Sequence, residues 1–461
     1  GTGLVLADEG RYIIPIAAEE KNTVHLFSNK KNGKEVSILQ RYDKTFEYYM
    51  ADGGTYIYSS GKSYYGKAVR IQNDTGKKRL VLNIFVDGLA QMLLRGEMFE
   101  KYMPCVYRYF KNGVICDRAY STGEWTYPVL ATYISGLSTT QHMMFHNQID
   151  GSLPHNIKTL AEGFEEAGYY TSAVNGDWRI IPSYGHARGY DHFIFQNSGF
   201  DAAGVVTHVI DQIEAMKDIN QFIWCSFGDL HDVADEWELP MDVSVKLNLQ
   251  DMGSECTGPT SVKQNYSEHK KKKYIMVMQR IDRYLGVLFE YIKNNYQEEE
   301  VLVSLFSDHG QGYLVPPGGE FLATERTNIA YMFRGCGCAP QRSQEIMSNL
   351  DYVKMMYHFA GIPYQEDRSE AVLPKCFGGE GRKWAVTESL HPGDPYRAVF
   401  NGDHCYAYFY NPVPVGHDGR FALADYEFYL MDDKGERFED ESLKNECLAV
   451  IRKRIKYLIK K

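Results

Sequence analysis

The chain has 461 residues, 44% of them hydrophobic and 35 of them tyrosine, which is enough apolar material for two to three domains. Its formal net charge of −10 argues against a nucleic-acid binder, because such proteins carry basic surfaces. No apolar run is long enough to span a bilayer, and no cleavable signal opens the sequence. The first residue is Gly, so a processed fragment with an anchor upstream stays open as an alternative.

The cysteines show no disulfide framework. They number nine and lack the regular spacing of a small secreted scaffold. Reduced thiols and a cytoplasmic location are therefore expected. The alternative is an extracytoplasmic soluble domain of a longer, membrane-anchored protein. Cys336 and Cys338 could form a thiol pair or bind a soft metal, but a structural role is favoured.

Three regions follow one another along the chain. Residues 1–78 alternate short Tyr, Ile and Val runs with clusters of Gly, Asn, Asp and Lys, which predicts an antiparallel, β-rich accessory domain. Residues 79–390 alternate strand and helix patterns, which predicts an α/β domain with a mostly parallel sheet sandwiched by helices. Residues 391–461 are expected to form a small C-terminal subdomain with antiparallel strands and a terminal helix.

The clearest elements of the α/β region are expected at 81–86 (strand), 160–167 (helix), 170–174 (strand), 222–227 (strand), 274–293 (helix) and 301–306 (strand). The basic run Lys270–Lys273 before the long helix is interpreted as a solvated face. In the terminal helix, one face carries Leu448, Ile451, Ile455 and Leu458. Docking of that face on the protein body is favoured over contact with an anionic membrane.

Two of the buried strands end in groups that bind metals. The run 81–86 ends in Asp87-Gly88, and the run 301–306 ends in Ser307-Asp308-His309-Gly310. Unbroken apolar runs suit strands covered on both faces, and open α/β sheets bind their ligands at the carboxyl ends of such strands. A carboxylate in a dry crevice needs a cation or several hydrogen-bond donors. Asp87, Asp308 and His309 are therefore predicted to share one metal site.

The composition of this ligand set favours manganese or zinc. Mixed oxygen and imidazole ligands suit these ions better than calcium, and magnesium stays open. A simpler interpretation is that both motifs are strand-ending turns.

Between these strands, Thr126 begins an expected helix. Its hydroxyl could face the metal while the helix N-terminus helps to hold an anion. The alternative is an ordinary helix cap, which is the common role of a threonine at this position.

The ordered motifs resemble the sulfatase branch of the alkaline phosphatase superfamily. They are Val86-Asp87-Gly88, Trp125-Thr126-Tyr127-Pro128 followed by Ser135-Gly136-Leu137, Thr159–Glu162 with Gly168–Thr171, Arg188–Phe193 and Ser307–Gly310. The resemblance covers residues 79 to 420 and leaves out the N-terminal β region. It implies an alkaline-phosphatase-like α/β fold.

The nucleophile position departs from true sulfatases. Those enzymes have Cys or Ser followed by x-Pro-x-Arg and oxidise it to formylglycine, whereas this chain has Thr126 and lacks the arginine. In this respect it is similar to the metal-dependent phosphotransferases that build lipoteichoic acid or attach phosphoethanolamine to lipid A. The resemblance implies a metal held by Asp87, Thr126, Asp308 and His309, and a covalent phosphothreonine at Thr126.

The resemblance also implies how the substrate is held. Trp178 and Arg179 look like the pair that binds the anionic head group, and a guanidinium suits this task because its planar donors match a phosphate or sulfate. His231 could protonate the leaving oxygen or contact the bound phosphate. Asp229, His391 and His404 are spare ligands for a second metal, which is not the favoured interpretation because the spacing of Asp229 and His231 is short.

The expected function is a metal-dependent hydrolase or transferase of phosphate esters or phosphodiesters. Its partner would be an anionic ester on a small molecule, a glycan or a lipid head group, with no nucleic acid involved. One alternative is a sulfuric ester hydrolase that works without formylglycine, and another is a non-catalytic carbohydrate-binding or assembly protein on the same fold. The sequence does not indicate the oligomeric state.

Overall fold

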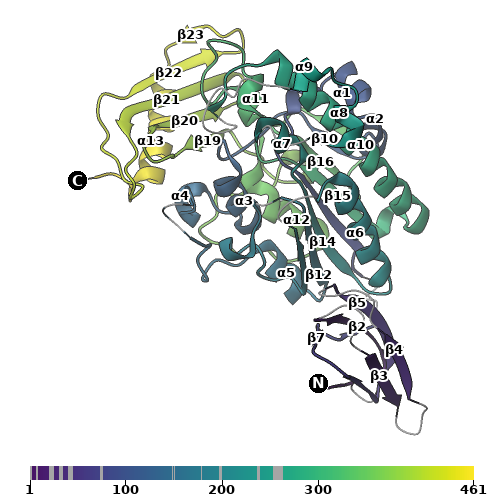
Figure 1. The fold of residues 1–461 in the computed structure, drawn as a ribbon. Helices are drawn as coiled ribbons and strands as arrows, with labels where there is room; N and C mark the ends of the chain where they lie inside the picture. Colours follow the sequence, from purple (N-terminus) through teal and green to yellow (C-terminus); the bar gives the residue numbers. More distant parts are fainter. Residues whose placement is uncertain are drawn as a thin grey trace.

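A computed structural model describes residues 3–6, 9–19, 25–30, 35–39, 45–72, 76–147, 149, 151–177, 179–196, 200–235, 239–252 and 263–460. A β-rich N-terminal part lies at one end of the molecule, an α/β body occupies the middle, and an antiparallel sheet lies beside the body near the C-terminus (Figure 1). None of the described helices is long and apolar enough to cross a membrane.

An eight-stranded sheet forms the centre of the body, in the order β13-β12-β14-β9-β15-β16-β10-β17. The strands from β13 to β15 run parallel, whereas β16 is antiparallel to both β15 and β10. The bounds are β9 (Leu80–Val86), β10 (Val114–Cys116), β12 (Tyr170–Asn175), β13 (His192–Phe195), β14 (Gln221–Phe227), β15 (Val301–Phe306), β16 (Tyr331–Arg334) and β17 (Gln341–Ser343). The predicted α/β class with a mostly parallel sheet is confirmed.

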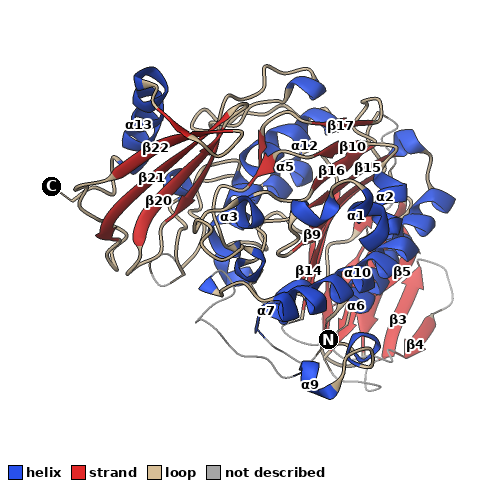
Figure 2. Cartoon of the chain, turned by 90° about the horizontal axis from the view of Figure 1, so that it is seen from above, coloured by secondary structure: helices blue, strands red, loops and turns tan. Residues whose placement is uncertain are grey.

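Helices cover both faces of this sheet (Figure 2). Along β9, Leu82 and Ile84 point into one core and Val81 and Phe85 into the other, which explains why the whole strand is apolar. The first core includes residues of α1 (Glu97–Tyr102), α2 (Pro104–Phe110), α6 (Ala202–Ala215), α7 (Asp229–Asp235), α8 (Met241–Ser244) and α10 (Glu268–Asn295). The second includes residues of α3 (Thr126–Ser135), α5 (Leu160–Glu166) and α12 (Tyr352–Ala360). The remaining short helices are α4 (Thr139–His142), α9 (Leu249–Met252) and α11 (Thr324–Thr327).

The basic run at the start of α10 is a solvated face only in part, because Lys272 is exposed and Lys271 is half-buried. Lys270 and Lys273 are both buried. The Lys270 ammonium donates to Gln264 Oε1 at 2.7 Å and to the Ala234 carbonyl at 3.2 Å. Local charge alone indicated a wet surface, but the segment before α10 covers this turn and supplies the oxygen acceptors that a buried ammonium requires.

The N-terminal part consists of two small antiparallel sheets, in the orders β1-β6-β3-β4 and β5-β2-β7, with β8 also on β2. Their strands are β1 (Gly3–Val5), β2 (Arg11–Ala18), β3 (His25–Lys30), β4 (Val36–Leu39), β5 (Glu47–Asp52), β6 (Thr55–Ser59), β7 (Ser63–Tyr65) and β8 (Val69–Arg70). Ile13 of β2 packs with Tyr170, Met216 and Ile219 of the body. This contact attaches the accessory sheets to the end of the central sheet opposite the predicted site.

The C-terminal sheet is antiparallel, in the order β19-β20-β21-β22-β23. Its strands are β19 (Ala385–Ser389), β20 (Pro395–Asn401), β21 (Cys405–Pro414), β22 (Glu427–Asp432) and β23 (Arg437–Phe438), so the sheet starts before residue 390. Helix α13 (Glu441–Ile455) buries the predicted apolar face against this sheet, and Leu458 packs there from beyond the helix end. Two short strands, β11 (Ala119–Tyr120) and β18 (Met347–Ser348), pair between the body and this sheet.

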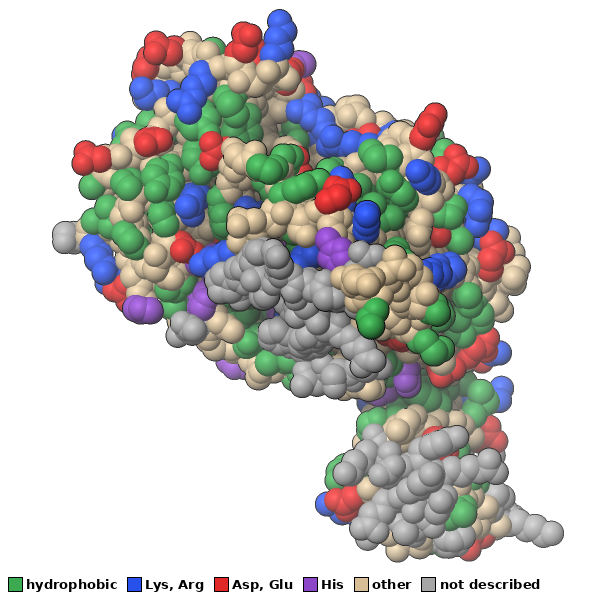
Figure 3. Space-filling model, turned by 45° about the horizontal axis from the view of Figure 1, so that its top comes forward, with side chains coloured by type: hydrophobic (Ala, Val, Ile, Leu, Met, Phe, Trp, Pro, Cys, Tyr) green, Lys and Arg blue, Asp and Glu red, His purple; other side chains and the backbone are tan. Residues whose placement is uncertain are grey.

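Charges of both signs are interspersed on the face of the described residues shown in Figure 3. This part of the surface has no continuous basic area of the kind that binds nucleic acid.

Candidate active site

The two predicted metal-binding motifs meet at the carboxyl edge of the central sheet. Asp87 follows β9, and Asp308 and His309 follow the neighbouring parallel strand β15. Ligand atoms of the three side chains all lie within 4.8 Å of one another. Asp87 and Asp308 have no exposed surface, and His309 is 1% exposed. The sequence placed these residues correctly because parallel strands bring their carboxyl ends to the same edge.

Backbone groups orient the cluster. Asp308 Oδ1 accepts hydrogen bonds from the backbone N–H of Gly88 at 3.0 Å and of His309 at 2.9 Å. His309 Nδ1 lies 2.6 Å from the Gly310 carbonyl oxygen, which can only accept, so the proton is on Nδ1 and Nε2 presents a lone pair. Gly88 has a φ of 70°, and a Cβ there would lie 2.1 Å from the Gln311 side-chain amide.

This cluster fits a divalent cation. Asp87 Oδ1 and Asp308 Oδ2 are buried and receive no hydrogen bond, which is costly for carboxylates. Burial, together with the neighbouring carboxylates of Asp308 and Asp177, raises the pKa of Asp87 well above its usual range. A cation bound by these oxygens and by His309 Nε2 would remove this repulsion.

Thr126 lies at the same cluster. It is the first residue of α3, and its Oγ1 lies 3.3 Å from both Asp87 Oδ2 and His309 Nε2. The N-cap residue of α3 is Trp125, and the Thr126 hydroxyl instead contacts Asp87 and His309. Thr126 is 2% exposed, so the hydroxyl faces the acidic cluster and not bulk water.

Arg179 and His231 form the opposite wall of the site. Arg179 Nη1 lies 3.0 Å from Asp177 Oδ1 and 4.0 Å from Asp87 Oδ2. Arg179 Nη2 lies 2.5 Å from His231 Nδ1. Because a guanidinium only donates, His231 Nδ1 accepts and the imidazole proton is on Nε2. Trp178, predicted beside Arg179, lies outside the described residues.

Residues 100–362 match the sulfatase family. The chain belongs to this family. Among curated proteins, no sequence matches it.

Several solved structures share the fold of this sulfatase-family protein. One is a 2-O GAG sulfatase, 17% identical, with a TM-score of 0.59 over 82% of this chain and 91% of that chain. Another is BT4656 in complex with D-glucosamine-2-N,6-O-disulfate, 13% identical, with a TM-score of 0.59 over 82% and 98%. A third is the phosphonate monoester hydrolase of Silicibacter pomeroyi, 15% identical, with a TM-score of 0.58 over 84% and 95%.

The three residues considered for a second metal lie in three different places. Asp229 is paired with Arg280, with Oδ1 3.2 Å from Nη1, and it also accepts from the backbone N–H of Ala202. His391 Nε2 lies 2.9 Å from Glu124 Oε1. His404 is exposed on the C-terminal sheet beside Asp433. The idea that these three side chains supply a common second site is therefore wrong.

Three parts of the sulfatase-family site were missed from sequence. Asp177 follows strand β12 at the same sheet edge, and the signal that identified Asp87 could have identified it too. Glu124 is buried, accepts from Ser389 Oγ at 2.7 Å, and has its pKa held down, against the effect of burial, by His391. Gln311 is buried beside Gly88, and neither atom of its side-chain amide has a partner among the described residues. The Glu124–His391 pairing joins distant segments and left no sequence signal.

Proposed function

We propose that the protein is a metal-dependent hydrolase or transferase of phosphate esters or phosphodiesters that forms a covalent phosphothreonine at Thr126. The observation that carries the proposal is the position of the Thr126 hydroxyl, 3.3 Å from both Asp87 Oδ2 and His309 Nε2 in a buried cluster. A hydroxyl held there can act as a nucleophile toward an anionic ester.

Asp87, Asp308, His309 and Thr126 would hold one divalent ion, and the mixed ligand set favours manganese or zinc over magnesium or calcium. When bound, the ion polarises the ester and stabilises a deprotonated hydroxyl. Asp87, Asp308, His309 and Thr126 are each at most 2% exposed, which keeps competing water away from the nucleophile.

The other residues have separate tasks. Arg179, with its side chain 10% exposed, balances negative charge on the nonbridging oxygens of the ester. As Thr126 Oγ1 forms its bond to phosphorus, the bond to the leaving oxygen breaks. His231 Nε2–H would donate a hydrogen bond to that oxygen as it leaves, because Nδ1 accepts from Arg179. Water or an acceptor hydroxyl then releases the phosphoryl group.

A second candidate is a sulfuric ester hydrolase that works without formylglycine. The family match supports it, as does the fold shared with a 2-O GAG sulfatase. The same buried nucleophile and arginine would suit a sulfate ester, since both esters present tetrahedral anionic oxygens.

The test compares wild-type protein and Thr126→Ala on an aryl phosphate, an aryl phosphodiester and an aryl sulfate, with metal content measured in each preparation. We expect the phosphate substrates to be turned over, and Thr126→Ala to lose activity by about a thousandfold or more while keeping the metal. Thr207→Ala, on the exposed side of α6, is the matched control. Intact-mass analysis should find a phosphoryl group on wild-type protein only.

Three other results of this test would change the proposed function. Turnover of the sulfate ester alone would favour the second candidate. Full activity in Thr126→Ala would refute the nucleophile assignment. A wild-type protein that binds no metal and turns over none of the three substrates would point to a non-catalytic carbohydrate-binding or assembly protein.

A further inference from the structure

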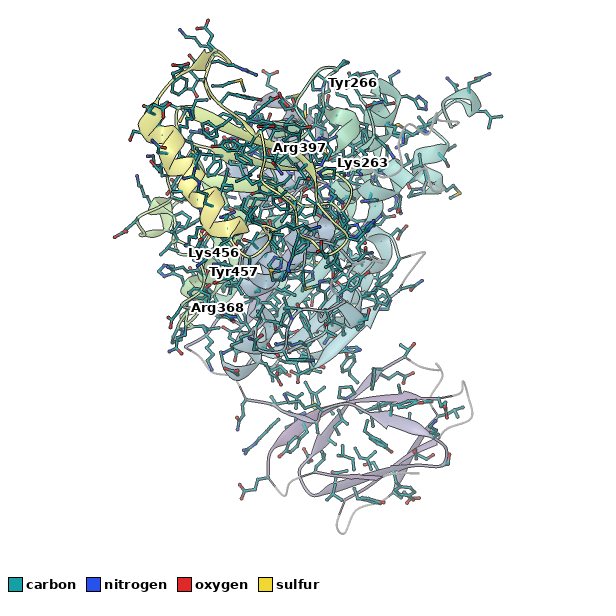
Figure 4. The ribbon with its side chains drawn as sticks, turned by 90° about the vertical axis from the view of Figure 1, so that its left-hand side faces the viewer. Lys263, Tyr266, Arg368, Arg397, Lys456 and Tyr457 are labelled. Atoms are coloured by element: carbon teal, nitrogen blue, oxygen red, sulfur yellow. The ribbon has the colours of Figure 1, made fainter. Side chains whose placement is uncertain are left out.

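A second pocket adjoins the candidate active site on the side of the C-terminal sheet. Its volume is about 600 Å³, and its lining includes Lys263, Tyr266, Phe321, Arg326 and Arg397. Lys263, Tyr266 and Arg397 lie near one another in the upper part of Figure 4, where the C-terminal sheet meets the body. Because β20 supplies Arg397 and the body supplies the other four residues, the pocket exists only when these two parts are packed together.

The pocket is structurally continuous with the metal-binding edge. Gly312, in the loop that follows His309, lines it. The backbone N–H of Gly310 donates to the Arg326 carbonyl oxygen at 2.7 Å. On the other side, the Asp394 N–H donates to the carbonyl of His391, the residue paired with Glu124 beside the nucleophile. A ligand in the pocket would therefore be next to an ester bound at Thr126.

Two arginines of the pocket lie against the same aromatic ring. The guanidinium carbons of Arg326 and Arg397 lie 4.4 Å and 4.7 Å from the centre of the same Phe321 ring. None of the described carboxylates lies within 4.0 Å of either guanidinium, the distance that defines an ion pair. Arg326 is 5% exposed, and its buried Nε has no hydrogen-bond partner within the described part of the chain.

The remaining charged groups do not neutralise these arginines. Lys263 Nζ and Asp394 Oδ2 pair with each other at 2.6 Å. Glu320 accepts a hydrogen bond from the Tyr429 hydroxyl at 2.9 Å. Burial, with a further contribution from Arg397, lowers the pKa of Arg326 to about 10 although Glu124 acts in the opposite direction. The two like charges repel each other, and an anion bound in the pocket would relieve this repulsion.

From this arrangement we infer that the pocket binds a second anionic group on the substrate, so that the preferred substrate is a saccharide-sized ester that carries at least two anionic groups. The planar donors of Arg397 match a sulfate, phosphate or carboxylate group, and Tyr266 and Phe321 offer flat apolar faces suited to a sugar ring. The inference rests on the proposed function, because the first anionic group is the ester attacked at Thr126.

Binding can be measured without turnover, using metal-loaded Thr126→Ala protein in a calorimetric titration. The probes are glucose 6-phosphate against glucose 1,6-bisphosphate, and glucosamine 6-sulfate against glucosamine-2-N,6-O-disulfate, with glucose 1-phosphate against glucuronic acid 1-phosphate as the carboxylate arm. We expect the doubly anionic member of at least one pair to bind about 10- to 100-fold more tightly, as for one charge-assisted hydrogen-bonded contact.

Substitution of Arg397 should remove this preference. Arg397→Gln is expected to bring the two members of the pair to nearly equal affinity, and Arg397→Lys to keep part of the difference because it keeps the charge but loses the planar donors. Arg437→Gln is the matched control, since Arg437 stacks 4.0 Å from the centre of the Tyr429 ring on the same sheet and is exposed. Thermal melts of all variants check that each is folded.

The outcomes separate the two proposals. Equal affinity for every pair in unsubstituted Thr126→Ala protein, or a preference that survives in folded Arg397→Gln, would overturn the pocket assignment. A preference that depends on Arg397 in a wild-type protein without ester turnover would support the pocket and refute the proposed catalysis. Turnover of aryl esters without a binding preference for doubly anionic probes would support the proposed catalysis and overturn the pocket assignment.

Discussion

Two buried acidic clusters lie near the carboxyl edge of the central sheet, and they differ in how their charge is balanced. The first contains Asp87, Asp177 and Asp308 with one arginine, Arg179, and all three carboxylates are at most 1% exposed. In the second, Arg280 contacts Asp201, Asp229 and Asp242 at 2.7, 3.2 and 2.7 Å.

In the second cluster, only Asp229 Oδ2 is buried without a hydrogen-bond partner among the described residues. The side chains of Asp201 and Asp242 are each 40% exposed, and Asp242 has a further partner in Arg283 at 2.6 Å. The first cluster has an excess of buried negative charge and carboxylate oxygens without donors. An aspartate after a buried strand therefore does not identify a metal site by itself. The number of such oxygens, three in the first cluster against one in the second, together with the charge balance supplied by Arg280, distinguishes the candidate metal site from the second cluster.

The strongest test of this comparison is Asp87→Asn. We expect metal binding to be lost and turnover to fall by about a thousandfold or more, because one charged ligand of the cation is gone. In metal-free protein the same change should raise the free energy of unfolding, since it removes repulsion from Asp308 and Asp177. Metal titration and urea unfolding measure the two effects.

Asp117→Asn is the control for that experiment. Asp117 is also buried, but its carboxylate accepts from Arg342 Nε at 2.7 Å and Gln91 Nε2 at 3.0 Å. Its substitution should destabilise the protein and leave the metal content unchanged. A metal-free Asp87→Asn protein less stable than the wild type would contradict the proposed excess charge.

The next largest effect is expected for Arg280→Met. Among the described residues, Arg280 is the only cation within 4.0 Å of Asp229, so its removal should lower the free energy of unfolding by about 3–5 kcal/mol, because a buried carboxylate loses its partner. Arg283→Met is the control, and its exposed ion pair should contribute less than about 1 kcal/mol. Metal stoichiometry should stay the same in both. If Arg280→Met lost metal without losing stability, the second cluster would have a functional role.

Arg179→Gln should have a smaller effect on activity. The variant keeps a hydrogen-bonding side chain but loses the charge that balances the ester oxygens, and we expect kcat/KM to fall by about 10- to 100-fold. Arg179→Lys should recover part of the lost kcat/KM. Because Arg179 also donates to His231, the pH dependence of kcat should change in Arg179→Gln but not in Arg188→Gln, an arginine that bonds Glu162 away from the cluster. An unchanged kcat/KM would remove Arg179 from the site.

The last expected effect is confined to acidic pH and concerns His142, whose side chain contacts helix α3. His142 Nε2 lies 3.2 Å from Thr132 Oγ1, and burial lowers the pKa of His142 to about 3. The folded state therefore binds fewer protons than the unfolded state, and stability should fall as the pH decreases from about 6.5 toward 3, by at most about 1.4 kcal/mol per pH unit. His142→Gln should flatten the dependence of unfolding free energy on pH. An identical slope in the variant would show that other groups cause it.

Much of the fold was predictable from local patterns. Strands β9, β14 and β15 are continuous apolar runs, and their ends were placed within a residue of the structure because each run stops at a polar residue or glycine. The grouping of Asp87, Asp308 and His309 followed from the same runs. The burial of Lys270 was not predictable, because its acceptors come from Gln264 and Ala234.

The sequence by itself determined the alternation of strands and helices, the positions of Asp87, Asp308 and His309 at the ends of buried strands, and the presence of threonine at position 126. These properties depend on residue type and local order along the chain. Only the tertiary structure decided which acids are neutralised, since Asp87 and Asp229 each end a buried strand but only Asp229 meets Arg280. It also placed Arg397 of the C-terminal sheet against Phe321 of the body. The charge balance depends on side chains that come from distant segments, and the local sequence does not show which of these side chains will be in contact.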